Sequence, residues 1–466
     1  LYSYPMCSSF LGFRHYPHAM ADFLHWSRDT LGSQAHVPEC GPADWTFDGP
    51  KYAYVQALQW DADADPAAIM EDFCEASYGA AAEPMCAFWQ QLEDVWEARE
   101  STSSYDDENT RLLFYQWVGW QVASYIPPND ELRTYTIEDV DALDASMAEA
   151  LEAAVEETEV VQYRVDRMEE AWSVYRTFVL SRIRYLDGDP PVDVTDDSEM
   201  AEVRTLADEI AGLRADRDDG RSAMAAHPEL NVKAGDPSYL ELGWLIGYTI
   251  FSFEQGLLDG ACSAISSYIA SQEGTDAAVA YWETVAEDDP LFQHALSQIH
   301  LLETGATELL TNGGFEQGLD SWTGIRSVET SGADPLEGSA SALMTGGGVA
   351  FLRQEVAIST EDRLRLTAWA RYGAEPDEHY VPADLDVAFY DATGTRLYDH
   401  DPTRAMVTTT SPEAGWTRVQ TTMTAPTSAA TATVTLRKQH DVDMYWDEVS
   451  LERILPGPEV EDGVLF

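Results

Sequence analysis

The stretch LRLTAWAR, residues 364–371, decides the fold of the C-terminal part of this 466-residue chain. Its apolar residues alternate with arginine, threonine and tryptophan, so in a strand one row of side chains faces a core and the other faces outward. The same alternation returns in LDVAFYD at 385–391 and in ATVTLR at 432–437. Several short strands of this kind between 309 and 454 predict an antiparallel β-sandwich, or jelly roll.

Upstream of Thr307 the apolar residues are instead spaced three and four apart, which is typical of helices that pack against one another. The first helix, PHAMADFLHWSRDTLG at 17–32, lies between two strand-like stretches, and strand–helix–strand is the repeating unit of an α/β barrel. We therefore predict a multidomain α + β protein with an α/β part at 1–49, a helical bundle at 50–306, the sandwich at 309–454 and a tail at 455–466.

The chain is strongly acidic, with 83 Asp and Glu residues against 27 Lys and Arg, a formal net charge of −56 and a pI near 4.1. Its 14 Trp, 22 Tyr and 15 Phe indicate a folded protein rather than a disordered acidic one. A dense carboxylate surface suits very high salt, where the Debye length falls to about 3 Å and acidic groups repel each other little. We expect a halophilic source, and we do not expect nucleic acids or anionic membranes as partners.

The five cysteines are scattered without a CxxC pair, so neither a zinc ribbon nor a disulfide framework is indicated. The sequence has no run of 18 apolar residues, so no membrane span is expected. It opens with LYSYPMCSSF, which has neither an initiator Met nor a signal peptide, and we interpret the chain as a fragment or a mature product.

Three aspartates, Asp61, Asp63 and Asp65, have the spacing of the first ligands of a calcium-binding loop. The sixth residue of such a loop needs positive φ, and proline, whose φ is fixed at about −65°, stands there as Pro66. We therefore predict that Asp65 caps a helix whose first residue is Pro66.

The longer stretch YVQALQWDADADPAAIMEDFCEASYGAAAEPM, residues 54–85, resembles a segment of an uncharacterised glycoside hydrolase-like family of bacteria and archaea. The matching residues are Trp60, Asp61, Asp63, Asp65, Phe73, Tyr78, Gly79, Ala81 and Ala82. In that family the segment follows a (β/α)8 barrel similar to the catalytic domains of α-glucuronidase and hexosaminidase. The resemblance implies that 1–49 is the remnant of such a barrel, and that the main catalytic residues for cleaving O-glycosyl bonds lie upstream of this chain.

Glu39 and Trp45, at the end of the predicted barrel remnant, are the candidates for substrate contact. A carboxylate can bind sugar hydroxyl groups and an indole can stack on a sugar ring, and barrel chemistry gathers at the carboxyl ends of the strands. The alternative is that Glu39 is an ordinary loop residue on a chain rich in glutamate. The pair of carboxylates about 5 to 10 Å apart that glycosidases require is not identifiable in the sequence.

The C-terminal part carries a second resemblance. LLTNGGFEQGLDSW at 309–322 resembles the opening strand of carbohydrate-binding modules of the family 4, 9 and 22 type, and MYWDEVSLERI at 444–454 is similar to their final strand. Such modules commonly hold a structural Ca²⁺ between their terminal strands. The resemblance implies that Glu316 and Asp447 supply carboxylate ligands, with Glu448 in place of a frequent second Asp. Without calcium, Glu316 is an ordinary edge carboxylate; no organic cofactor is expected.

The outward-facing side chains of the three alternating strands are the candidates for carbohydrate binding: Arg365, Trp369, Arg371, Asp386, Tyr390 and Arg437. If these strands share one concave sheet, Trp369 and Tyr390 offer ring faces among hydrogen-bonding groups, which is what a sugar needs. The alternative is that an outward Trp only covers the neighbouring sheet. Trp322 and Trp416, which stand beside turns, are expected in the core.

These patterns predict the C-terminal portion of a halophilic, extracellular or cell-surface glycoside hydrolase-like protein, with the sandwich as a carbohydrate-binding module for a polysaccharide or oligosaccharide. The alternative is a non-catalytic surface protein that binds carbohydrate and mediates adhesion. Both functions place carbohydrate at the sandwich, and they differ in whether the protein also cleaves it.

Overall fold

The computed structural model describes residues 2–7, 13, 15–41, 45–98, 135–186, 194–225, 246–325, 327–346, 348–374, 383–397, 404–407, 415–438, 441–458, 460–461 and 464–465. The chain divides into two compact units, the first made of Leu1–Asp187 with Leu213–Gly247 and the second of Gly188–Gly212 with Tyr248–Phe466. Helices α10 (Asp197–Ala225) and α11 (Ile246–Glu273) contribute residues to both units.

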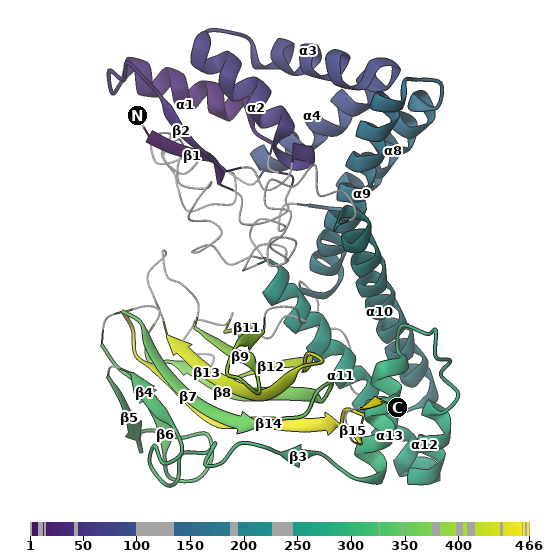
Figure 1. Ribbon diagram of the computed structural model, residues 1–466, viewed down its shortest axis with the longest axis vertical. Coiled ribbons are helices and arrows are strands. Elements are labelled where there is room, and N and C mark those ends of the chain that lie inside the picture. The colour runs from purple at the N-terminus through teal and green to yellow at the C-terminus, as the bar shows by residue number, and fades with distance from the viewer. Residues whose placement is uncertain are drawn as a thin grey trace. The chain divides into compact units, whose positions relative to one another are not determined.

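The first unit begins with strand β1 (Tyr2–Cys7), helix α1 (Pro17–Asp29) and strand β2 (Val37–Gly41), and its two strands pair in parallel (Figure 1). The predicted strand–helix–strand unit is therefore present. One such unit does not close a barrel, so the barrel remnant itself stays a prediction. The helices that follow are α2 (Trp45–Trp60), α3 (Pro66–Tyr78), the 3-10 turn η1 (Gly79–Ala81), α4 (Ala82–Ala98), α8 (Ile137–Ala154), α9 (Glu159–Ser181) and the π-helical turn η3 (Arg182–Leu186).

The aspartate run enters helix α3 as the sequence predicts. Asp65 is the N-cap residue, and its Oδ1 accepts a hydrogen bond from the N–H of Ala67 at 3.1 Å, with Pro66 as the first helical residue. The carboxylate of Asp63 instead forms an ion pair with Arg28 at 3.0 Å. The run is thus a helix entrance, and its carboxylates are used in capping and ion pairing.

An aromatic core holds the helices of the first unit together. The ring of Phe13 lies 5.6 Å from that of Phe88 and 6.1 Å from that of Trp172, and it also contacts Trp89 and Tyr175. These rings come from segments that are far apart in the sequence. Burial of such large apolar side chains is the main stabilising contribution to a helical unit of this kind.

The second unit combines α12 (Thr275–Trp282) and α13 (Phe292–Glu303) with two six-stranded antiparallel sheets (Figure 1). Sheet C has the order β12–β8–β14–β6–β5, with β3 beside β14; the bounds are β12 (Thr417–Thr424), β8 (Arg363–Tyr372), β14 (Met444–Leu455), β6 (Ser341–Met344), β5 (Val328–Ser331) and β3 (Thr307–Glu308). Sheet D has the order β10–β9–β13–β7–β4, with β11 beside β9; the bounds are β10 (Arg396–Leu397), β9 (Asp384–Asp391), β13 (Ala429–Lys438), β7 (Ala350–Ala357), β4 (Thr323–Ile325) and β11 (Arg404–Met406). A separate hairpin joins β15 (Val460–Glu461) to β16 (Val464–Leu465).

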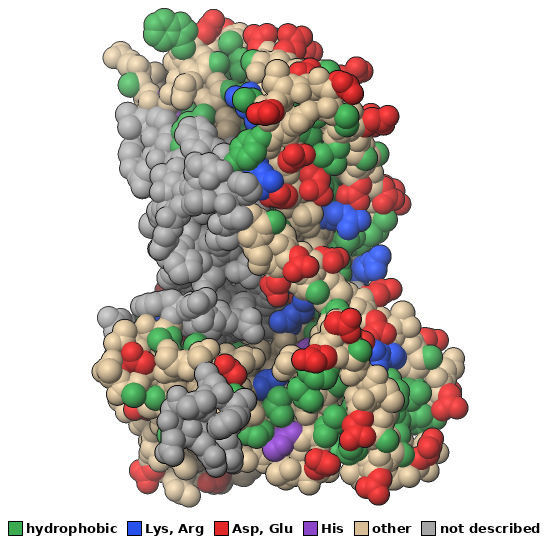
Figure 2. Space-filling view, turned by 45° about the vertical axis from the view of Figure 1, so that its right-hand side comes forward, with side chains coloured by type: hydrophobic (Ala, Val, Ile, Leu, Met, Phe, Trp, Pro, Cys, Tyr) green, Lys and Arg blue, Asp and Glu red, His purple; other side chains and the backbone are tan. Residues whose placement is uncertain are grey.

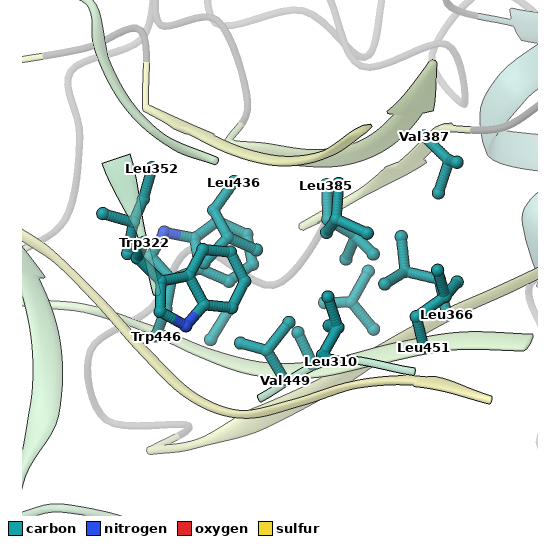
Figure 3. Packing of buried hydrophobic residues seen from close by; sticks show 14 of the residues in the cluster. Leu310, Trp322, Leu352, Leu366, Leu385, Val387, Leu436, Trp446, Val449 and Leu451 are labelled. Carbon is teal, nitrogen blue, oxygen red and sulfur yellow. The ribbon is translucent and has the colours of Figure 1, made fainter. Parts of the chain in front are cut away.

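The space between the two sheets is filled by the apolar rows that the alternation predicts (Figure 3). Leu366 from sheet C and Leu385 and Leu436 from sheet D are fully buried, and Trp446 closes one end of the core. Trp322 belongs to the same cluster, so its prediction as a core residue is confirmed. The mixed α + β fold and its β-sandwich are therefore confirmed.

The opening strand that the resemblance implies at 309–322 is not formed. Turns occupy most of that stretch, and the short strands β3 and β4 lie on either side of it. Asn312 and Phe315 adopt positive φ values of 56° and 55°, which is incompatible with a strand. The Asn312 amide donates hydrogen bonds to two carbonyl oxygens later in the same turn and holds it closed.

Acidic side chains are spread over the face of the molecule shown in Figure 2, on helices and strands alike. The acidic residues are likewise spread along the whole sequence and are not confined to one tail. Among the described residues, none of the helices combines the length and apolar character needed to cross a membrane.

Candidate functional site

The six residues predicted to bind carbohydrate fall into two groups on different sheets. Arg365, Trp369 and Arg371 lie on β8 of sheet C; the other three lie on sheet D, Asp386 and Tyr390 on β9 and Arg437 on β13. The premise that the three strands share one sheet is therefore wrong. Alternation within a strand fixes which side chains face outward, but it does not say which sheet the strand joins.

On sheet D, charged side chains are paired across neighbouring strands. Arg437 lies opposite Asp384 of β9 and opposite Phe351 of β7. Its guanidinium nitrogens are 3.8 Å from carboxylate oxygens of both Asp384 and Asp386, and its centre lies 5.8 Å from the Phe351 ring. Asp384 and Asp386 are buried, and the Arg437 guanidinium lies beside both acids at ion-pair distance.

The same face extends from this pair in two directions. Arg353 of β7 is exposed and lies 4.9 Å from the ring centre of Phe351, so two guanidinium groups flank one aromatic ring. Tyr390 is half-buried and lies six residues along β9 from Asp384, about 20 Å at a rise of about 3.4 Å per residue. Aromatic rings and charged hydrogen-bonding groups are therefore spread along one sheet face.

On sheet C, two of the predicted residues are already engaged within the protein. Arg365 donates two hydrogen bonds to Oε2 of Glu452, at 2.9 and 2.7 Å. Arg371 lies between two rings, 4.4 Å from the centre of Tyr445 and 5.3 Å from that of Trp416. Trp416 is half-buried against this arginine and is not part of the core cluster, so its prediction as a core residue is wrong. Trp369 is half-buried in the same strand.

Helices α11 and α13 cover part of the outer face of sheet C. Asp259 of α11 accepts a hydrogen bond from Thr422 of β12, and Nη2 of Arg363 on β8 lies 3.1 Å from Nδ1 of His294 on α13. All four residues are buried. The chain's own helices therefore cover part of this face, whereas Arg353 and Glu355 on the outer face of sheet D are exposed.

The predicted metal ligands Glu316 and Asp447 lie at a junction where two turns meet strand β14. The carboxylate of Glu316 accepts hydrogen bonds from the N–H and hydroxyl of Ser339, at 2.8 and 2.6 Å. Asp447 is fully buried and accepts from the N–H of Leu336 at 2.9 Å and from that of Glu448 at 2.9 Å. The backbone approach is tight, since a Cβ on Gly313 would lie 1.8 Å from the carbonyl oxygen of Val449. This accounts for the first glycine of the NGGFE motif, Gly313.

Electrostatics at this junction indicate crowded negative charge. Burial raises the pKa of Asp447, and burial together with repulsion from Asp447, Glu337 and Glu316 raises the pKa of Glu448. The hydroxyl and N–H groups of Ser339 lower the pKa of Glu316, which stays anionic. Among the described residues, no Lys, Arg or His forms an ion pair with these four carboxylates. Oxygen donors suit a hard cation such as Ca²⁺. In the part of the chain that the structure describes, however, no three of these carboxylates bring their oxygens within 4.8 Å of one another, so the calcium site stays a prediction.

A group of metal-ligating side chains in the first unit is explained by helix capping. Ligand atoms of His18, Glu93 and Glu97 lie within 4.8 Å of one another. Buried Glu93 accepts a hydrogen bond from the N–H of His18 at 2.9 Å and lies 2.9 Å from its Nδ1, at the start of α1. Burial alone would lower the pKa of His18, but Glu93 outweighs it and raises that pKa. Glu93 therefore stabilises a helix N-terminus, and no metal is assigned here.

The two candidates for substrate contact are placed only by their backbone. Glu39 lies in β2 and Trp45 is the first residue of α2, and the side chains of both lie outside the described residues. Their roles stay predictions.

The sequence matches no described protein family and no curated protein. Among solved structures, the chain is similar to a family 16 carbohydrate-binding module, to the CBM22-1 xylan-binding domain from Paenibacillus barcinonensis, and to TmCBM61 in complex with beta-1,4-galactotriose. Their identities to this chain are 25, 17 and 17%, and the matches cover 31 to 33% of this chain and 97 to 99% of the other. The TM-scores are 0.26, 0.27 and 0.24, too low for these likenesses to bear on what this chain binds.

Proposed function

We propose that the β-sandwich binds a polysaccharide or oligosaccharide on the outer face of sheet D. The observation that supports this most is the position of Arg437, which lies against Asp384 and Asp386 and beside Phe351 on one sheet face. A sugar presents hydroxyl groups around its ring and C–H groups on its faces. The guanidinium groups of Arg437 and Arg353 would donate to the hydroxyls, and the Phe351 ring would contact a C–H face. The carboxylates of Asp384 and Asp386 are buried and would act through Arg437.

The pairing of acids with arginine matters for affinity. A side chain that is already held in place loses little conformational freedom when a ligand arrives, so more of the interaction energy appears as binding. Arg353 is exposed and adds a second guanidinium beside the same ring. Tyr390 would contact a more distant residue of a longer oligosaccharide. This favours a chain-like ligand over a monosaccharide.

The proposal extends to a structural Ca²⁺ at the junction of Glu316 with β14. Glu316 and Asp447 would hold the ion, and Glu448 and Glu337 add negative charge around it. The ion would supply positive charge that the described residues do not provide at this junction. Its effect would be on the stability of the sandwich rather than on the ligand face, since Asp447 and Glu448 lie in β14 of sheet C and Glu316 lies in a turn beside it.

The wider role remains the one predicted from the sequence. We propose that the sandwich serves a glycoside hydrolase-like protein that works outside the cell or at its surface in high salt. The parallel pairing of β1 with β2 around α1 supports an α/β part, and the spread of acidic side chains in Figure 2 supports the high-salt setting.

The direct test is a binding survey of the full chain against a panel of soluble polysaccharides, by retardation in affinity gels at high salt. Retardation by at least one polysaccharide, relieved by the matching free oligosaccharide, is the expected result. Absence of retardation by the whole panel, in a chain whose circular dichroism shows it to be folded, would reject carbohydrate binding.

A further inference from the structure

Cys74 and Cys86 face each other from two adjacent helices of the first unit. Cys74 of α3 is fully buried, and Cys86 of α4 is half-buried. The thiol of Cys86 donates a hydrogen bond to the carbonyl oxygen of Met70, at 3.6 Å. In an α-helix the N–H of a residue bonds to the carbonyl four positions earlier, so this carbonyl is also the helical partner of Cys74. The Cys86 thiol therefore lies at the turn that carries Cys74.

The direction of helical side chains brings the two sulfur atoms together. A side chain leans toward the N-terminus of its own helix, so the Cys74 thiol is directed over the turn of Met70. Each thiol shifts the pKa of the other, raising that of Cys74 and lowering that of Cys86. Only the turn η1 separates the helices along the chain, and α3 and α4 pack side by side.

We propose that Cys74 and Cys86 form a disulfide bond that links α3 to α4 when the protein meets a disulfide oxidant. The Cys86 thiolate attacks one sulfur of the oxidant, a mixed disulfide forms, and one oxidant thiol leaves. The Cys74 thiolate then attacks the Cys86 sulfur, and the second oxidant thiol leaves. The two cysteines lose two electrons and two protons in total, and the oxidant is reduced to two thiols.

The order of attack follows from exposure and from the two thiols' acidity. Cys86 is the more accessible thiol, and the hydrogen bond from Cys74 lowers its pKa. The hydrogen bond with Cys86, together with burial, raises the pKa of Cys74. Glu71 and Glu75 place negative charge near Cys86, so an uncharged oxidant should react better than an anionic one.

Peptide mapping of the full chain tests the proposal. The protein is incubated with uncharged hydroxyethyl disulfide, and its remaining thiols are alkylated in denaturant. It is then cleaved after glutamate without reduction. Glu75 lies between the two cysteines, and the bond after Glu83 is not cleaved because Pro84 follows it. Residues 72–75 and 76–93 therefore separate unless a disulfide joins them. We expect the two fragments to remain joined, to separate on reduction, and to weigh two hydrogen atoms less than their sum.

The same digest shows whether the disulfide fails to form. Fragments found apart, whether they carry the alkyl group or a hydroxyethyl adduct on Cys86, would overturn the proposal, because the adduct means that Cys74 does not reach the mixed disulfide. Cys86→Ser should yield no joined fragment. Cys262, a buried thiol on α11 in the second unit, serves as the internal control and should remain alkylated. The test is decided by the wild-type chain, so its outcome stands even if the Cys86→Ser variant does not fold.

Discussion

The carboxylate of Asp259 on α11 accepts a hydrogen bond from the hydroxyl of Thr422 on β12, 163 residues further along the chain. His294 on α13 approaches the other oxygen of the same carboxylate at 3.5 Å. The helices that precede the sandwich are thus joined to the outer face of sheet C by a buried polar cluster. Helices and sheets of the second unit share one packed interface, so we expect them to unfold together.

The first prediction concerns the stability of that interface. Asp259→Ala removes a buried carboxylate and leaves His294 and Thr422 without its oxygens, a change that costs about 3 to 5 kcal/mol when a buried pair is broken. We expect the urea midpoint for the second unit to fall accordingly. Asp288→Ala, which changes an exposed aspartate in the same unit, should shift the free energy of unfolding by less than about 0.5 kcal/mol. Equal effects of the two substitutions would contradict the buried cluster.

A second prediction follows from the acidity of Asp259. Burial alone would raise its pKa, but the hydrogen bond from His294 and the charges of His294 and Arg363 outweigh burial and lower it. A carboxylate whose pKa is lower in the folded than in the unfolded state contributes stability above the unfolded value of about 3.9. That contribution is lost as the pH falls through the pKa that Asp259 has in the folded state. The difference in free energy of unfolding between wild type and Asp259→Asn should therefore shrink below about pH 4, as acid titration of the melting temperature would show.

The N-cap at the aspartate run gives a third prediction. Asp65→Ala removes the hydrogen bond to the N–H of Ala67 and should lower the stability of the first unit by about 1 kcal/mol. Asp72→Ala on the exposed side of the same helix removes an acid without removing the cap, and alanine's higher helix propensity should leave stability equal or slightly higher. Urea unfolding of both variants decides the matter. If both variants lost the same free energy of unfolding, the cap at Asp65 would contribute nothing.

Calcium gives a fourth prediction. At a Ca²⁺ concentration about 100 times Kd, binding stabilises the folded state by about 2.7 kcal/mol, which for a unit of this size raises Tm by about 5 to 10 °C. Asp447→Asn should abolish this rise, while Glu355→Gln on the outer face of sheet D should keep it. Scanning calorimetry with calcium and with a chelator gives the comparison. An unchanged wild-type Tm would reject the metal site.

The local structure of this protein follows closely from its sequence. Asp65 and Pro66 predict the start of α3 because a cap and a fixed φ act over two or three residues. The alternation in LRLTAWAR predicts which side chains are buried because it depends only on the geometry of one strand. Leu364, Leu366 and Leu436 are all buried as expected.

Long-range arrangement is where the sequence is insufficient. Trp369 and Tyr390 share a pattern but not a sheet, because the order of strands is set by contacts between segments far apart in the chain. The resemblance predicts a strand where Asn312 forms a turn, because it does not register the close approach of Gly313 to Val449. Asp259 stands among apolar residues in GLLDGAC, and an acid in that setting is a signal for a buried polar contact.

The most direct test of carbohydrate binding on sheet D compares variants on the two faces by titration calorimetry, with an oligosaccharide of the polysaccharide that retards the wild-type chain. Arg437→Ala and Arg353→Ala change sheet D, and Trp369→Ala changes sheet C. We predict that each sheet D variant loses at least about tenfold in affinity, or about 1.4 kcal/mol, and that Trp369→Ala binds as the wild type does. Wild-type affinity in both sheet D variants, or a tenfold loss in Trp369→Ala alone, would contradict the account.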